Sequence, residues 1–489
     1  MGIMLEIKRR FRGNSFQCYP RSSFRGSLLI GALLFGISLS YLFLSVAHRP
    51  QPLSPDHTTE LYALLARSFL QGRTSLPLEP RPELLSLPDP YDPVANSKYR
   101  LLDASLYKGQ YYLYFGAVPV VTLFLPFRLV TGQDLPNRVA VAIFCIGGFL
   151  SSCALFFLVT AHNNWDLPFS LQCAVIVSLG SMSLVSLILR RPLFYEVAIA
   201  SGYCFVMLGF LIIGMTILGR RAASKWLLLA GLMFGLAVGC RPHLVVICGI
   251  VLGAFAIRLR RNPRLVIALA TGMVVCGILI GWYNYVRFDN PLEFGRTYQL
   301  TAFSVNPSLA FHSPGFNLRG FLYSAEEFLF LPLRVDASMP FLHTALINPL
   351  SREPARVVWT EGMVGLTPAA PFALLGCLAP LLLSRRIVSV DLFDNTSAWL
   401  VYTMYWSGVG VFLSLCLVGW VIGRYLVDFA PLLTFAGVSV VTLLWQALAG
   451  HRTRSAFSWG VGATVIYGVL VNVALATPTG GQLLNFVHK

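Results

Sequence analysis

Two kinds of side chain in this sequence could carry chemistry: carboxylates that accept a proton and arginines that hold an anion. The carboxylate candidates are Asp56, directly behind Ser54-Pro55, then Glu60 one helical turn later, and Glu196. A positioned carboxylate is a common general base, and arginine holds phosphate oxygens through two parallel hydrogen bonds. The candidate substrate-binding residues lie at predicted helix ends or in a long loop, and they are Lys108, Tyr112, Arg138, Arg190, Arg191, Arg241 and Arg424.

Each candidate also has a purely structural interpretation. Asp56 can complement the dipole of a helix that begins there, and Glu60 can lie on a solvated helix face. Arginines at helix ends can anchor them at the membrane interface, and Tyr112 can belong to an aromatic belt. The histidines of the predicted outer loops lack metal-ligand spacing, so the sequence predicts no metal site.

The composition points to lipid as the main solvent. Of the 489 residues, 56% are hydrophobic and 12% are charged, about half the charged share of an ordinary soluble protein. The formal net charge of +16 does not indicate nucleic-acid binding, because the basic residues form short tracts between apolar runs. Cys18 lies in the basic N-terminus and the other cysteines lie in apolar segments, so no disulfide framework is expected.

The positioning elements are membrane helices, and we predict about eleven of them in an all-α polytopic protein. The predicted spans are 27–47, 138–160, 169–189, 197–218, 226–239, 243–257, 265–283, 365–383, 399–419, 428–445 and 457–476. The basic tracts alternate between these spans. The positive-inside rule therefore places the N-terminus in the cytoplasm and the C-terminus outside, with the chain multi-pass in the plasma (inner) membrane.

This topology divides the chain into segments with most of the chemistry outside. The predicted segments are a basic cytoplasmic N-terminus (1–26), the first transmembrane helix (27–47), a long extracytoplasmic catalytic loop (48–137), a transmembrane core (138–283), a second extracytoplasmic loop (284–364), C-terminal transmembrane helices (365–476) and an extracytoplasmic tail (477–489). In the first loop, helical spacing predicts an amphipathic juxtamembrane helix over 56–71. Prolines predict an extended stretch over 76–99. A second interfacial or half-inserted helix is predicted over 111–130, ending at Gly132.

Several short runs carry a resemblance to a known family. They are Asp56-His57-Thr58-Thr59-Glu60-Leu61-Tyr62, Leu70-Gln71-Gly72-Arg73, Gly109-Gln110-Tyr111-Tyr112-Leu113-Tyr114-Phe115-Gly116-Ala117-Val118-Pro119, the segment from Asn284 to Gly295, and Arg424-Tyr425-Leu426-Val427-Asp428-Phe429. The first loop resembles that of GT-C superfamily glycosyltransferases, in the branch of protein O-mannosyltransferases and aminoarabinose transferases. The resemblance implies a bundle with its active site at the outer membrane face and a polyprenyl-phosphate sugar as donor.

Such a donor already carries a good leaving group, so transfer to a hydroxyl needs one carboxylate base and cations for the departing phosphate. The chain is therefore expected to be an inverting glycosyltransferase with Asp56 as base, no certain cofactor, and a protein, lipid or glycan as acceptor. Relatives usually carry adjacent acidic residues where this chain has Asp56-His57, which leaves His57 and Glu60 open as the functional residue.

Two other functions fit a bundle with long outer loops. The first is an O-antigen polymerase or ligase, although such proteins carry their major loop late in the chain. The second is a transporter or flippase of lipid-linked sugars, for which buried mid-helix charges and internal repeats are expected. The sequence shows charge concentrated at helix ends and no clear repeat.

Overall fold

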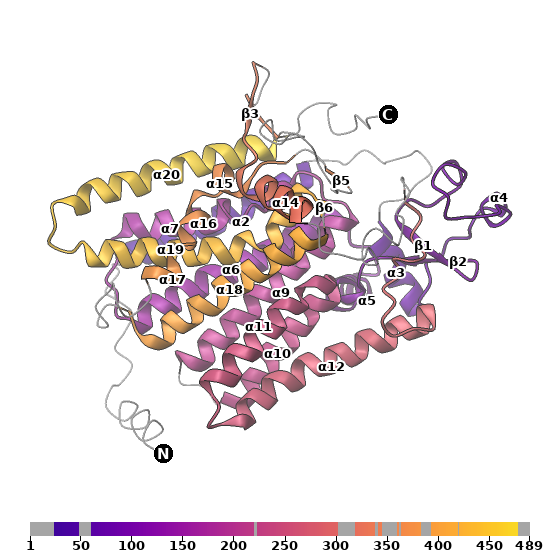
Figure 1. Cartoon of the computed structure of the whole chain (residues 1–489), viewed down its shortest axis with the longest axis horizontal. Coiled ribbons are helices and arrows are strands. Elements are labelled where there is room, and N and C mark those ends of the chain that lie inside the picture. The colour runs from indigo at the N-terminus through magenta and orange to yellow at the C-terminus, as the bar shows by residue number, and fades with distance from the viewer. Residues whose placement is uncertain are drawn as a thin grey trace.

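The computed structural model describes residues 24–47, 60–219, 223–301, 318–337, 341–344, 359–360, 363–382, 393–418 and 420–477. Among them, seven helices are long and apolar enough to cross a membrane. These are α2 (Phe24–Ala47), α6 (Asn137–His162), α9 (Phe194–Ile217), α12 (Pro263–Phe288), α18 (Asn395–Val418), α19 (Ala430–Ala447) and α20 (Thr453–Ala476). They run roughly along the long axis of the molecule (Figure 1). The chain is thus a mostly helical, multi-pass membrane protein, as the sequence predicts.

The other predicted crossings are shorter or interrupted. Three of the corresponding helices are α7 (Phe169–Ser181), α10 (Ala223–Cys240) and α11 (Val245–Arg258), the last preceded by the 3₁₀ turn η2 (Pro242–Leu244). The total of eleven crossings therefore remains a prediction.

Two predicted single helices are broken, and both breaks have a local cause. The span 169–189 divides into α7 and α8 (Ser186–Leu189) because Leu184 has a left-handed backbone, with φ of 61°. The span 365–383 divides into α15 (Leu366–Ala369), α16 (Pro371–Gly376) and α17 (Ala379–Leu382). Proline lacks a backbone donor and disfavours helical geometry in the residue before it, and Ala370 before Pro371 has φ −142° and ψ 67°.

The first long loop folds onto the bundle through one helix and one hairpin. Helix α3 (Leu61–Leu70) buries Leu61, Tyr62 and Leu65, and the Tyr62 ring stacks on Phe124 with centroids 5.4 Å apart. The short helix α4 (Pro82–Leu85) lies within the proline-rich stretch. Strands β1 (Ala104–Tyr107) and β2 (Gln110–Leu113) pair antiparallel through Lys108 and Gly109, which both have positive φ, as a two-residue hairpin turn requires.

The predicted helix over 111–130 is wrong in its first part. Tyr111 to Leu113 belong to β2, and the helix begins only with the π-helical turn η1 (Val120–Phe124) and α5 (Leu125–Thr131). Tyr111 and Tyr112 are both buried in the strand, and aromatic residues favour strand pairing over the helix that their hydrophobicity suggested. The end is as predicted, because Gly132 closes α5 in a left-handed conformation with φ of 72°.

The second long loop joins the first. The backbone amide of Leu106 donates to the Tyr298 carbonyl at 2.8 Å, and that of Leu300 donates to the Ala104 carbonyl at 2.9 Å. The remaining elements are α14 (Leu318–Phe330), β3 (Arg334–Val335), β4 (Leu342–His343), β5 (Trp359–Thr360), β6 (Trp420–Val421) and η3 (Gly423–Asp428). The beginning of the second loop is therefore hydrogen-bonded to the β1–β2 hairpin of the first.

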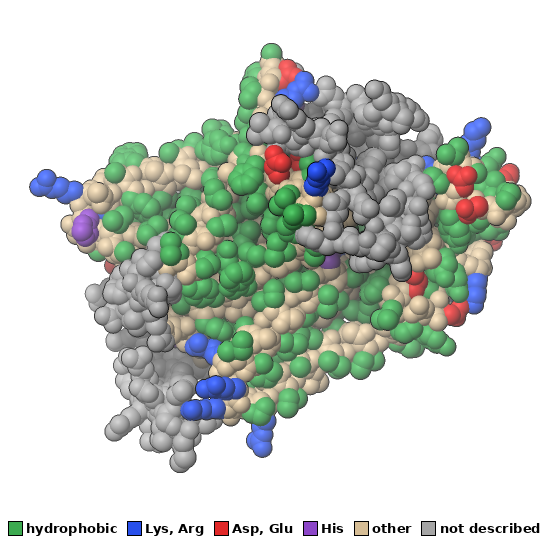
Figure 2. Space-filling model, in the orientation of Figure 1, with side chains coloured by type: hydrophobic (Ala, Val, Ile, Leu, Met, Phe, Trp, Pro, Cys, Tyr) green, Lys and Arg blue, Asp and Glu red, His purple; other side chains and the backbone are tan. Residues whose placement is uncertain are grey.

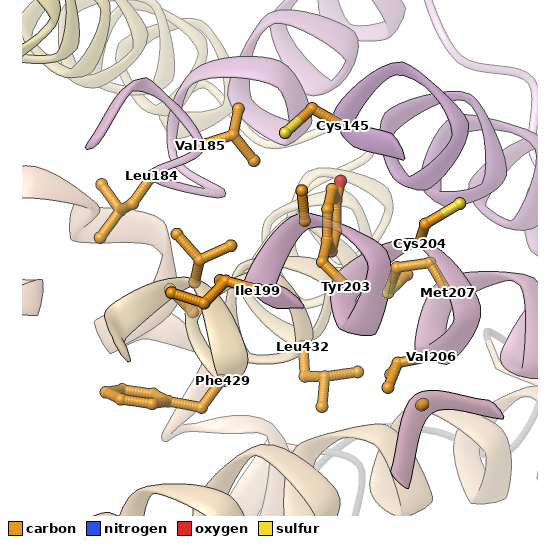
Figure 3. Close-up of a cluster of buried hydrophobic side chains, with 14 of the residues drawn as sticks. Cys145, Leu184, Val185, Ile199, Tyr203, Cys204, Val206, Met207, Phe429 and Leu432 are labelled. Carbon is orange, nitrogen blue, oxygen red and sulfur yellow. The ribbon is translucent and has the colours of Figure 1, made fainter. Parts of the chain in front are cut away.

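Helix α9 is the centre of the core, because 89% of the residues in its apolar stretch are buried. Figure 3 shows Ile199, Tyr203 and Met207 of this helix between Cys145 of α6 and Leu432 of α19. Nine cysteines among the described residues are free, and most of them are buried, as expected of small packing residues.

Charge divides the two ends of the molecule. Acidic side chains gather mainly at the end that carries α4 and the β1–β2 hairpin, which we call the loop end (Figure 2). The opposite end carries basic side chains, including those between α11 and α12 and before α20.

Candidate functional site

The first loop is seated on the loop end of α10 by a contact that only glycine allows. A Cβ on Gly116 would lie 1.6 Å from the carbonyl oxygen of Gly239, near the end of α10. A Cβ on Gly239 would in turn lie 2.4 Å from Val118 and 3.1 Å from Ile280 of α12. The tyrosine-rich run of the first loop is therefore held directly beside the α10–η2 corner, where Arg241 lies.

Asp103 connects both loops to the bundle. Its backbone is left-handed, with φ of 60°, and its amide donates to the Leu300 carbonyl at 2.8 Å. One carboxylate oxygen accepts a short hydrogen bond from the Tyr195 hydroxyl of α9, and the other accepts one from the Gln299 amide at 3.0 Å. Burial raises the pKa of the Asp103 carboxyl, while the bond from Tyr195 and the charge of Arg424 oppose that rise.

Arg424 lies on the other side of Tyr195. Its guanidinium carbon is 4.9 Å from the centre of the Tyr195 ring and 5.9 Å from that of Tyr425. Its Nη1 atom lies 3.9 Å from Oε1 of Glu196, whose other oxygen accepts a bond from the backbone amide of Leu193 at 3.1 Å. Glu196 therefore closes the N-terminus of α9 as well as facing the arginine.

Arg241, directly before η2, forms a buried ion pair with Asp428 at the end of η3. Its Nη2 atom lies 2.9 Å from Oδ2 of Asp428, and Nε2 of His243 lies 3.2 Å from the same oxygen. The guanidinium of Arg241 also lies over the ring of Tyr425 at 4.5 Å. Its Nε atom is buried and has no hydrogen-bond partner among the described residues.

The Tyr114 hydroxyl lies within electrostatic range of several of these groups. Burial raises the pKa of its hydroxyl, and the charged groups that act on it include Arg296, Arg241 and Asp103. We define the loop-end cluster as the set of side chains connected in this way, and they are Asp103, Tyr114, Tyr195, Glu196, Arg241, His243, Arg296, Gln299, Arg424, Tyr425 and Asp428.

The cluster is accessible on part of its surface. Asp103, Tyr114, Arg424 and Tyr425 are half-buried, whereas Glu196 and Asp428 are buried. Arg100 adds a further positive charge that acts on Asp103. Four arginines therefore face three carboxylates, an excess of positive charge that suits an anionic ligand.

The predicted carboxylates lie in different places. Asp56 and His57 lie outside the described residues. Glu60 accepts a bond from the backbone amide of Asn137 at 2.8 Å and so caps the first turn of α6. Burial raises the pKa of Glu60, and the Asn137 bond and Arg138 oppose that rise. Glu196 is the predicted carboxylate that lies in the cluster.

The predicted binding residues also divide. Arg241 and Arg424 lie in the cluster, and Arg191 is near enough to act electrostatically on the Tyr195 hydroxyl. Arg190 donates to the Leu475 carbonyl at 3.2 Å, and the carbonyl of Arg138 accepts a bond from Ser45 at 2.7 Å. The hairpin holds the remaining two, because exposed Lys108 pairs with Asp289 at 2.6 Å and Tyr112 packs edge-on against Phe288.

Sequence reasoning did not single out Asp103 or His243 as site residues. Asp103 was a lone carboxylate ahead of the tyrosine-rich run, and its partners Tyr195 and Gln299 are 92 and 196 positions away. His243 directly follows the Arg241-Pro242 pair at a helix break, which was the one local signal available.

Within the described ranges, no group of three His, Cys, Asp or Glu side chains lies close enough together to hold a metal ion. Comparison with protein-family models and with curated proteins finds no match to this chain.

Proposed function

We propose that this protein is a membrane glycosyltransferase that moves a sugar from a polyprenyl-phosphate donor to an acceptor hydroxyl at the outer membrane face, with inversion. The observation that carries the proposal is that two guanidinium groups, those of Arg241 and Arg424, lie over the ring of Tyr425. The half-buried carboxylate of Asp103 lies within range of the Arg424 charge. This arrangement supports the transferase because a departing phosphate needs arginines and an attacking hydroxyl needs a carboxylate.

In this mechanism, the acceptor oxygen attacks the anomeric carbon on the face opposite the phosphate. The bond from carbon to phosphate oxygen breaks, its electron pair leaves with the phosphate, and a carboxylate takes the hydroxyl proton. The arginines of the loop-end cluster, together with Arg100, stabilise the charge that develops on the phosphate. Tyr114 and Tyr425 offer aromatic faces and hydroxyls for the sugar.

The proposal is tested by transfer of radiolabelled sugar from a panel of polyprenyl-phosphate monosaccharides, using purified protein in lipid. Wild type should form product with at least one donor. Arg424→Lys keeps a positive charge but cannot form a bidentate hydrogen bond to the donor phosphate. The KM for the donor should therefore rise roughly tenfold to 100-fold. Absence of transfer from every donor would contradict the proposal.

One observation favours a second function, transport of a lipid-linked sugar. The ion pair between Arg241 and Asp428 is buried and joins two breaks in helical structure, the α10–η2 corner and η3. Transporters often bind substrate at such breaks. Movement of a fluorescent lipid-linked sugar across sealed vesicles, without product formation, would favour that function.

A further inference from the structure

The described carboxylates near the arginines of the loop end are not equally able to take a proton from a substrate. Glu60 caps α6, and Glu196 closes α9 while facing Arg424. Asp428 has only 1% of its side chain exposed and is paired with Arg241 and His243. A general base must reach the hydroxyl it deprotonates, directly or through one water.

Glu60 is half-buried, but its carboxylate caps α6. Asp103 is more accessible than the buried Glu196 and Asp428. It keeps exposed surface, while both of its oxygens are oriented by donors from two other elements, Tyr195 and Gln299. Each carboxylate oxygen has two lone pairs, so one bond to each leaves room for an incoming proton. Arg241, whose charge acts on the same Tyr114 hydroxyl as that of Asp103, has a buried Nε donor without a hydrogen-bond partner among the described residues, which independently indicates an acceptor-bearing ligand at the loop-end cluster.

We infer that Asp103 is the proton acceptor of the transfer reaction, held in place by Tyr195 and Gln299. This inference rests on the proposed function. In the step, the acceptor O–H bond breaks as its oxygen forms the new bond to the anomeric carbon. The proton passes to a carboxylate oxygen of Asp103, and the phosphate leaves with the electron pair of the broken bond. Solvent then takes the proton from Asp103.

The charged and titratable groups around Asp103 fit this role. Tyr195 faces it from α9, Arg424 from η3 and Arg100 from the first loop, while Gln299 supplies a neutral donor. Burial moves the pKa of Asp103 upward, toward the operating pH, where a general base is most effective. The bond from Tyr195 stabilises the ionised form.

The test compares Asp103→Asn with Asp289→Asn in the transfer assay. Asp289 is a matched control, because it also has a left-handed backbone, with φ of 56°, and also accepts a tyrosine hydroxyl, that of Tyr107. Asp103→Asn should lower kcat roughly 100-fold to 10,000-fold with donor binding retained. Asp289→Asn should leave kcat within about twofold of wild type, since exposed substitutions rarely disturb a distant site.

A pH profile separates catalysis from a merely structural role. Tyr195→Phe removes a bond that favours the ionised carboxylate, so the acid limb of kcat/KM should move to higher pH. An unmoved acid limb in Tyr195→Phe, together with more than a tenth of wild-type kcat in Asp103→Asn, would overturn the inference. Loss of transfer in Asp56→Asn with activity kept in Asp103→Asn would also overturn it and favour Asp56. If wild type transfers sugar from no donor, the proposed function itself fails.

Discussion

Arg287 is a buried charged residue at the loop end, and neighbouring groups accept its hydrogen bonds. Arg287 near the end of α12 is 3% exposed and donates to the Leu113 carbonyl at 2.8 Å and to the Asn284 side chain at 2.6 Å. Its guanidinium lies over the Tyr283 ring at 4.1 Å. Arg287 fixes the β1–β2 hairpin to the bundle through these two donors, while its buried Nε has no hydrogen-bond partner among the described residues.

The raised pKa of Asp103 predicts a stability effect that does not depend on activity. Its folded-state pKa lies above the ordinary value of about 3.9. Ionisation therefore costs the folded state more than the unfolded state, and stability falls as pH rises from the ordinary to the raised pKa. Asp103→Asn should raise the apparent melting temperature at pH 8 and raise it less at pH 4. An equal shift at both pH values in detergent-solubilised protein would contradict this.

Substitution of Glu60 should lower the stability of the protein, because Glu60 has a structural role at the start of α6 and no role in the reaction. Glu60→Ala removes the cap on the Asn137 amide and should cost about 1 kcal/mol. Glu60→Gln keeps an oxygen for the same amide and should cost less. Chemical denaturation in micelles, followed by tryptophan fluorescence, measures both. Equal losses in the two variants would show that the charge, and not the hydrogen bond, is what α6 requires.

The site residues show what a single sequence can and cannot predict. Arg241 and Arg424 were predicted because positive charge at a helix end is visible locally, and both lie in the cluster. The role of Asp103 depends on Tyr195 and Gln299, which the fold brings from distant parts of the chain. Local sequence patterns do not predict contacts between residues so far apart in the chain.

The elements divide in the same way. Hydrophobic runs located α6 and α20 to within a few residues, since lipid-facing helices must be continuously apolar. The breaks within 169–189 and 365–383 were missed. Each follows from one backbone position, Leu184 or Ala370, whose geometry only the packed structure defines.

The contact between Gly116 and Gly239 predicts an effect at this scale. Gly116→Ala places a methyl group against a backbone carbonyl, so the first loop must lift from α10. We expect a loss of roughly 1–3 kcal/mol, together with reduced transfer, because the cluster includes Tyr114 two residues earlier. Gly36→Ala in α2 is the control, since its added Cβ meets nothing within 4 Å. Measurements of unfolding and of sugar transfer on both variants show whether the contact between Gly116 and Gly239 is needed for stability and for activity.

The whole molecule has a charge asymmetry that predicts which end faces which side of the membrane. Acidic side chains lie mainly at the loop end, and basic side chains lie at the opposite end (Figure 2). His451 and Arg452 directly precede α20, and Arg454 lies in its first turn. Because short basic loops stay in the cytoplasm, the loop-end cluster should face outward. An outward cluster would meet a lipid-linked sugar presented on the outer leaflet.

Cysteine labelling tests this orientation on whole cells that express the protein. Glu83→Cys in α4 should react with a membrane-impermeant maleimide in intact cells, and Ala449→Cys between α19 and α20 should react only after permeabilisation. Both positions are solvent-facing, so a difference reports the side of the membrane and not burial. The parent chain with its native cysteines gives the background. Labelling of Ala449→Cys but not Glu83→Cys in intact cells would place the cluster in the cytoplasm, where an outer-leaflet donor could not reach Arg241 and Arg424.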